Sequence, residues 1–250
     1  MHAAVLLSMS FVGPPGMQAP LNARSTWCRS SVVADLTSPL LAVLFALLPT
    51  IPERGMVDYD ERRPPTWVAA MEAAVAELEA HDPSGGDWMV DDAFSGRWRL
   101  AYTSSPMFRR NRGLSAFGAY VDGVWTPELY LELGPRSRLE LEEPLDRESA
   151  ALLARHLRLP AEEPLPDAVR VASLWAVGSG DSLKLTFEQV SVGSKAWAPA
   201  NAAERGEVDF EQDKAIRVLG ATRPTYLDGS VLVLRALTDA VFVMTREAAS

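Results

Sequence analysis

The feature that most constrains the fold is a change in the spacing of apolar residues near Gly96. Over 66–80 they recur at helical spacing, as Val68, Met71, Val75 and Leu78. From Arg97 to Thr103 they alternate with polar residues, which is the pattern of a half-buried strand. The sequence therefore predicts an amphipathic helix followed by β-structure.

Alternation recurs along the rest of the chain, at 128–133, 138–142, 169–175, 182–188, 231–235 and 241–245. Turn residues such as Gly134-Pro135 and Asp228-Gly229 separate these segments. Many short strands joined by turns are typical of an antiparallel sandwich or barrel. The segment 143–167 is helical in pattern and then rich in proline and acids, so we expect an insertion over one end of the sheet.

The N-terminal segment has the composition of a targeting peptide rather than of a folded domain. Residues 1–34 contain no Asp or Glu but include Arg24, Arg29 and several hydroxyl side chains. This is typical of an organelle transit peptide, although a disordered tail that merely lacks acids reads the same way. The run Ser10-Phe11-Val12-Gly13-Pro14 resembles the Phe-Val-Ala-Pro signature at the start of the transit region in algae with complex plastids. We expect a plastid-targeting leader at 1–52, a polar linker at 53–65 and one domain at 66–247.

A second apolar run, 40–48, lies between Pro39 and Pro49. It is short for a membrane span, which needs about 20 residues. Three interpretations are open: a stop-transfer segment within the leader, the apolar region of a second signal directed to the thylakoid, or a helix of the mature protein packed on the domain or on a membrane. We favour the first.

Composition excludes several classes of function. The formal net charge is −9, so the chain repels phosphate backbones and nucleic acid is not an expected partner. Cys28 is the single cysteine, and His2, His81 and His156 are far apart. We therefore expect no disulfide, metal centre or other cofactor.

No catalytic set emerges either. Neither His81, at a helix end, nor His156, in the insertion, accompanies a plausible nucleophile. The neighbouring carboxylates Glu142 and Glu143 lie in a strand pattern, where adjacent side chains point to opposite faces, and they read as solvated surface rather than an acid and base couple. We expect a protein that binds rather than an enzyme.

Two groups of residues are candidates for function. Phe108, Arg109, Arg110 and Arg112 predict a loop tip that dips into a membrane surface and holds lipid phosphate, although an ordinary basic loop is the alternative. Trp98, near the start of the domain, could meet Arg235 or Arg246 near its end. An arginine over that indole would close the barrel base with a cation–π attraction of about 0.5–2 kcal/mol.

The two ends of the domain also carry a family resemblance. Residues 94–105, FSGRWRLAYTSS, resemble the opening motif L-x-G-x-W-x-L-x-Y-T-S of the plastid lipid-associated proteins, also called fibrillins or plastoglobulins. The sequence TYLD at 225–228, followed by Arg235 and by FVMTR at 242–246, resembles their closing motif. The resemblance covers about Trp67 to Arg246. It implies a lipocalin-like β-barrel preceded by a helix, association with plastoglobules, thylakoids or stroma, and binding of fatty acids, quinones or carotenoids.

The chain departs from the family at the closing end. Leu232 stands where the family often has its first arginine after the Tyr-Leu-Asp motif. An anion site at that end is therefore in doubt. We expect the remaining Asp228 and Arg235 to form a partly buried pair that pins the last hairpin.

The leading hypothesis is a plastid barrel that carries an apolar molecule, in a lumen lined by Trp98, Tyr102, Trp175, Phe187 and Tyr226. Ordinary core packing explains these aromatic residues equally well. In the second hypothesis the barrel is a scaffold that docks on a thylakoid complex or lipid body through the Phe108 loop, the insertion or the 40–48 helix. A lipid or isoprenoid enzyme is a third, less favoured hypothesis.

Overall fold

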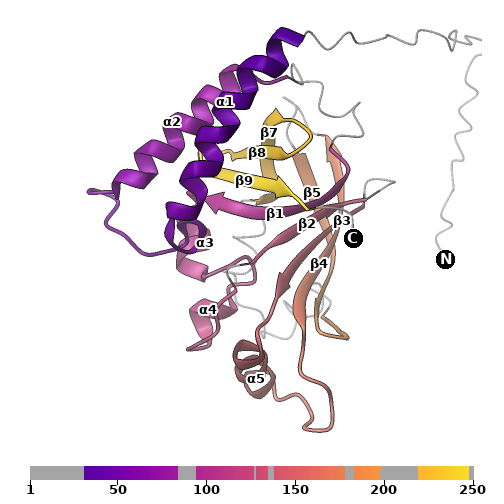
Figure 1. Ribbon diagram of the computed structural model, residues 1–250. Helices are drawn as coiled ribbons and strands as arrows, with labels where there is room; N and C mark the ends of the chain where they lie inside the picture. Colours follow the sequence, from indigo (N-terminus) through magenta and orange to yellow (C-terminus); the bar gives the residue numbers. More distant parts are fainter. Residues whose placement is uncertain are drawn as a thin grey trace, which may run out of the picture.

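The computed structural model describes residues 31–83, 94–126, 128–134, 138–177, 183–197 and 219–247. Its strands form one antiparallel sheet in the order β4-β3-β2-β1-β9-β8-β7-β5-β6, and β4 also pairs with β5. That last pairing closes every strand except β6 into a barrel (Figure 1). The strands are β1 Gly96–Thr103, β2 Tyr130–Leu133, β3 Arg138–Pro144, β4 Ala168–Val177, β5 Leu183–Val192, β6 Lys195–Trp197, β7 Ala221–Leu227, β8 Val231–Ala236 and β9 Val241–Arg246. The prediction of a lipocalin-like antiparallel barrel preceded by an amphipathic helix is confirmed.

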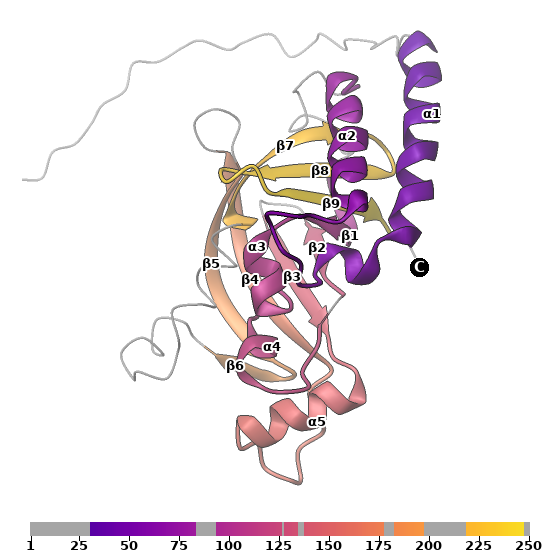
Figure 2. The same cartoon turned by 90° about the vertical axis from the view of Figure 1, so that its left-hand side faces the viewer.

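Two long helices cover one side of the barrel. Helices α1 (Ser31–Leu47) and α2 (Thr66–Ala80) lie side by side over β7, β8, β9 and β1 (Figures 1 and 2). The stripe predicted for α2 is the face that it buries, with Met71, Val75 and Leu78 inaccessible to solvent. These side chains pack with Leu44 of α1 against the outward side chains of β8 and β9.

The apolar run 40–48 is therefore part of the folded domain. Leu44 is fully buried, and Leu40, Leu41, Leu47 and Leu48 are partly buried against the same cluster. The short 3-10 helices η1 (Leu48–Thr50) and η2 (Pro52–Gly55) continue this packing, with Ile51 and Met56 buried. Of the three interpretations, the structure matches a helix packed on the domain rather than the stop-transfer segment that we favoured. Among the described residues, no helix has the length and apolar character needed to cross a bilayer.

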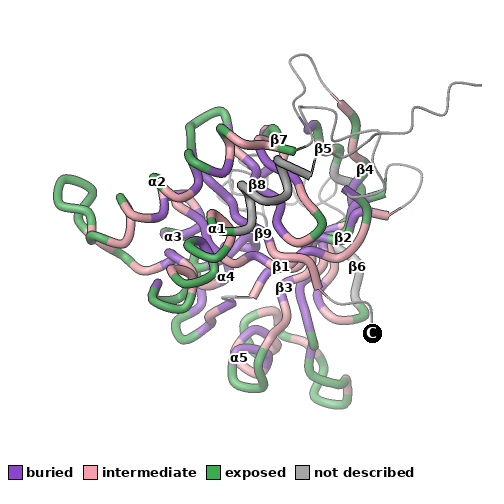
Figure 3. Tube along the Cα trace, turned by 45° about the horizontal axis from the view of Figure 1, so that its top comes forward, coloured by how far each residue is buried: buried purple, intermediate pink, exposed green. Residues whose placement is uncertain are grey.

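The opposite end of the barrel is covered by the connections between strands. Helices α3 (Pro106–Asn111) and α4 (Phe117–Tyr120) lie between β1 and β2. Helix α5 (Arg147–His156) lies between β3 and β4, and its Leu153 packs with Phe117 and Val124. The insertion covers one end of the barrel as expected, but it is shorter than 143–167, because β3 runs to Pro144 and includes Glu143. The buried residues gather along the strands, whereas the outer side of α5 and the loop after it are exposed (Figure 3).

Candidate functional site

The register of the strands defines which side chains face the barrel interior. Trp98 pairs with Leu131, Leu131 with Leu141, Leu141 with Val171, and Val171 with Val190. Paired residues in an antiparallel sheet share a face, so these side chains form one inward ring. Four of the five belong to the largest core cluster, and the partly buried Val190 packs against it.

Trp98 and Arg246 close one end of this interior. The Arg246 guanidinium lies over the Trp98 ring, with its Cζ atom 4.2 Å from the ring centroid. It donates hydrogen bonds to the carbonyl oxygens of Ser95 at 2.7 Å and Gly229 at 2.9 Å. Gly96 has a φ of +127°, which other residues rarely adopt, and a Cβ atom there would lie 2.6 Å from Arg246 Nη1, so this position favours glycine. Arg246, rather than Arg235, is the arginine that meets Trp98.

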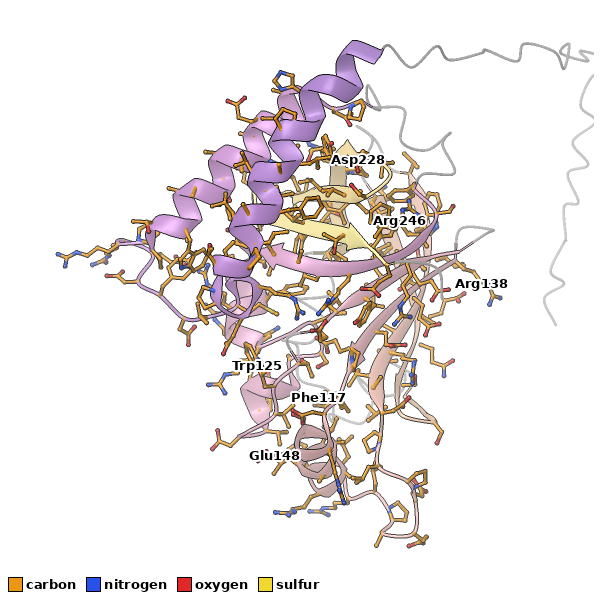
Figure 4. All side chains as sticks on the ribbon, in the orientation of Figure 1. Phe117, Trp125, Arg138, Glu148, Asp228 and Arg246 are labelled. Carbon is orange, nitrogen blue, oxygen red and sulfur yellow. The ribbon has the colours of Figure 1, made fainter. Side chains whose placement is uncertain are left out.

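Arg235 instead ties helix α2 to the outside of the barrel. Its Nε and Nη2 donate to the two carboxylate oxygens of Glu79 at 2.6 and 2.9 Å. Asp228 serves the β7–β8 turn and accepts hydrogen bonds from the backbone amides of Ser230 and Val231 and from the Tyr226 hydroxyl. The predicted pair of Asp228 and Arg235 is wrong, because Arg235 lies four residues beyond Val231, or about 13 Å along an extended strand. Asp228 and Arg246 lie at the same end of the barrel, away from Phe117 and Glu148 (Figure 4).

Tyr102 and Tyr226 do not line the interior. The pairing of β1 with β9 shifts between Leu100 and Tyr102, and that of β7 with β8 shifts between Pro224 and Tyr226. A bulge of this kind moves the following side chain to the other face of the sheet. Both tyrosines therefore pack outside the barrel, with Leu44, Met71 and Val75 of the two helices.

Trp175 is the predicted pocket residue that does face the interior. It pairs with Leu185, and its ring meets the edge of Phe94 at a centroid distance of 5.6 Å. Although they point inward, Trp175, Val177, Leu185 and Val190 are only partly buried. The backbone of Phe187 pairs with Ser173, but the Phe187 side chain lies outside the described residues. Trp98, also proposed as a pocket residue, is fully buried beneath Arg246.

The interior beside β4 also holds two polar atoms without hydrogen-bond partners, Ser173 Oγ and Trp175 Nε1. Both atoms are shielded from solvent, and buried polar groups in native proteins are nearly always paired. Sequence reasoning missed Ser173, although its alternation with Val171 and Trp175 places all three on one face. The inner surface of β4 and β5 is thus the candidate ligand site.

The residues proposed for a membrane-dipping loop form helix α3 and its end. Phe108 is fully buried and packs on Phe242 with a centroid distance of 5.1 Å. The Arg109 guanidinium is engaged by Glu61 at 2.7 Å and by the Tyr59 hydroxyl and ring. The prediction is wrong for these two residues, which are needed inside the fold. Arg110 and Arg112 are exposed.

Glu143 is an important residue that sequence reasoning misassigned to the surface. Its carboxylate is buried and accepts hydrogen bonds from the backbone amides of Leu114 and Ser115 and from Thr126 Oγ1. Burial raises the pKa of Glu143 to about 7, despite the lowering effect of these hydrogen bonds. Glu143 thereby holds the α3–α4 connection over the end of the barrel opposite Arg246. Continued alternation from Leu139 and Leu141 would have placed it inward.

A separate pocket of about 360 Å³ lies between the segment after α1, the end of α3 and the segment after α4. Its lining mixes both charge signs with apolar groups: Glu53, Met56, Val57, Asp58, Arg109, Arg112, Gly123, Val124 and Trp125. Within the described residues, no group of His, Cys, Asp and Glu is placed to hold a metal ion. No family model and no curated protein matches this chain.

Proposed function

We propose that this protein is a plastid lipid-associated protein of the fibrillin type, and that its barrel binds or carries an apolar molecule at thylakoids or plastoglobules. The observation that carries the proposal is the inner face of β4 and β5. Four apolar side chains that point into the barrel there are only partly buried, those of Trp175, Val177, Leu185 and Val190, and two polar atoms lack partners. A site that is mostly apolar with a few placed polar groups is the usual form of a small-molecule site.

Two further features support the family part of the proposal. The motif residues at the two ends of the domain are neighbours, since Trp98 pairs with Arg246 in the register of β1 and β9. The same two residues stack, as expected for a barrel whose base is closed by an arginine over an indole. The proposed localisation rests on the composition of residues 1–34 and on this resemblance.

The test is to fill the candidate site with one side chain. Val177 points inward beside Trp175, whereas Ala176 is exposed on the outer face of the same strand. Val177→Trp should lower the affinity of the full chain for apolar fluorescent probes by at least about tenfold, because it occupies the volume that a ligand needs. Ala176→Trp is the matched control and should leave binding unchanged. Equal binding by both variants, with both folded, would refute this site.

A second function, docking on a lipid body or membrane surface, is favoured by a specific feature of α1. Between Asp35 and Glu53 the chain carries no ionisable side chain. Leu44 faces the barrel, but Val43 and Phe45 are 52% and 43% exposed. A helix that carries no charge after Asp35 and has apolar side chains on its outer face is suited to lie in a lipid interface.

Flotation with lipid vesicles tests this second function. The double change Val43→Ser and Phe45→Ser should release the full chain from vesicles, since it removes apolar surface and leaves Leu44 in place. Ala73→Ser on the exposed side of α2 is the control. Unchanged flotation of the double variant would show that α1 is not the lipid contact.

A further inference from the structure

The two unpaired polar atoms of β4 indicate which chemical groups a ligand of this site should present. Ser173 and Trp175 are two residues apart on one strand and point to the same face, with Val171 on one side and Val177 on the other. An indole N–H is a donor only, so the partner that Trp175 lacks must be an acceptor. A serine hydroxyl can donate to the same kind of atom.

We propose that the ligand of the barrel is a neutral apolar molecule that presents carbonyl oxygen to Ser173 Oγ and Trp175 Nε1. This inference rests on the proposed function and names the ligand class of the same site. Two residues apart on a strand span about 7 Å. The donors therefore suit a ring that carries carbonyl groups on opposite sides, as in a quinone, or one carbonyl toward which both side chains lean.

The charges around the interior oppose a carboxylate ligand. Among the described inward-facing residues, Arg246 is the cation at this end, and its guanidinium is engaged by Ser95, Gly229 and the Trp98 ring. At the other end, the buried carboxyl of Glu143 already takes up the donors of Leu114, Ser115 and Thr126. A free fatty acid would bring a second carboxylate into an interior whose described residues offer it no unengaged cation.

A pure hydrocarbon fits less well for a different reason. It would fill the apolar space but leave Ser173 Oγ and Trp175 Nε1 buried without partners. A site built with hydrogen-bond donors discriminates against an analogue that lacks the matching group. The interior should therefore distinguish two ligands that differ only in their carbonyl oxygens.

The test compares three probes by isothermal titration calorimetry on the full chain: a hexyl-naphthoquinone, hexylnaphthalene as its hydrocarbon twin, and hexadecanoate as the carboxylate. The wild type should bind the quinone at least about tenfold more tightly than either of the others. Ser173→Ala and Trp175→Phe should each weaken quinone binding several-fold and leave the hydrocarbon unaffected. Ser191→Ala, on the outer face of β5 opposite Arg170, is the matched control.

The outcomes separate this inference from the function on which it rests. If the wild type binds the hydrocarbon or hexadecanoate as tightly as the quinone, the carbonyl inference is overturned and an apolar site remains. The same holds if folded Ser173 and Trp175 variants keep the preference for the quinone. If no probe binds, the proposed function itself fails. Far-ultraviolet circular dichroism identifies any variant that has lost its fold.

Discussion

The two sides of the barrel differ in how completely they are packed. On the side of β1, β9 and β8, the inward side chains Leu100, Leu232, Leu234 and Phe242 are fully buried, and two helices cover the outer face. On the side of β4 and β5, Val171 and Leu183 are buried, but two polar atoms are unpaired and four inward apolar side chains are partly exposed: Trp175, Val177, Leu185 and Val190. The interior is therefore fully packed on the side that the two helices cover, and it is less completely packed beside β4 and β5, where we place the ligand. The following predictions test this contrast.

The largest effect on stability is expected when a leucine is changed to alanine on each side of the barrel in turn. Leu234→Ala should lower the free energy of unfolding by about 2–5 kcal/mol, because it leaves a cavity in a fully packed region. Leu185→Ala removes the same atoms from a partly exposed position and should cost about 1 kcal/mol. Urea denaturation of both variants measures the difference, and similar losses would contradict the contrast.

Glu143 should make the covered end of the barrel sensitive to pH. Its pKa is about 7 in the folded protein, above the ordinary glutamate value of 4.5, so the native state holds the proton more tightly than the unfolded chain. Its contribution to stability is therefore complete below about pH 4.5 and is lost as the pH rises to about 7. The loss is about 3 kcal/mol, because one pH unit of difference between the folded and unfolded pKa corresponds to about 1.36 kcal/mol.

Glu143→Gln should remove that part of the pH dependence, because the amide does not titrate. The measurement is the free energy of unfolding at pH 4.5 and at pH 7.5, compared between wild type and variant. Glu140→Gln, exposed on the outer face of the same strand, is the control. A pH dependence identical in wild type and Glu143→Gln would show that this carboxyl does not titrate in the window.

The closed side also depends on the contact between Arg235 and α2. Glu79→Gln should destabilise the protein by about 1–3 kcal/mol, because a charge-assisted, two-point hydrogen bond is replaced by a weaker one. Glu77→Gln is on an exposed part of the same helix and should change little. Thermal melting of the two variants checks this prediction, which fails if they melt together.

The smallest effect is expected at the base of the barrel. Arg246→Met keeps much of the stem over Trp98 but loses the charge, and should cost about 1 kcal/mol or somewhat more. Tryptophan fluorescence should shift as the environment of Trp98 changes. Arg223→Met, at an exposed position of β7, should give neither effect.

The sequence predicted the elements of this fold better than the faces of its strands. Alternation identified most strands because a half-buried strand repeats every two residues. It missed β7, where Pro224 lies beside a bulge and breaks the pattern. The two bulges also reversed the expected side of Tyr102 and Tyr226, since one extra residue changes the face of every side chain after it.

Contacts between elements that are far apart in the chain were the other feature that the sequence could not predict. Nothing local in the sequence links Arg235 to Glu79, because the partner comes from a helix 156 residues earlier. The run 40–48 read as a targeting segment because its apolar character is the same whether its neighbour is lipid or a protein core. By contrast, the sequence narrowed the partner of Trp98 to Arg235 or Arg246, because the first and last strands are neighbours in an up-and-down barrel, and the register selects Arg246.

The pairing of β1 with β9 has a consequence for folding during synthesis. During synthesis β1 emerges first, and its open edge stays available until Val241–Arg246 has left the ribosome. An unpaired strand edge is a template for association with other chains. Loss of even the last dozen residues would therefore leave β1 and β8 without their common partner and favour aggregation over a smaller barrel.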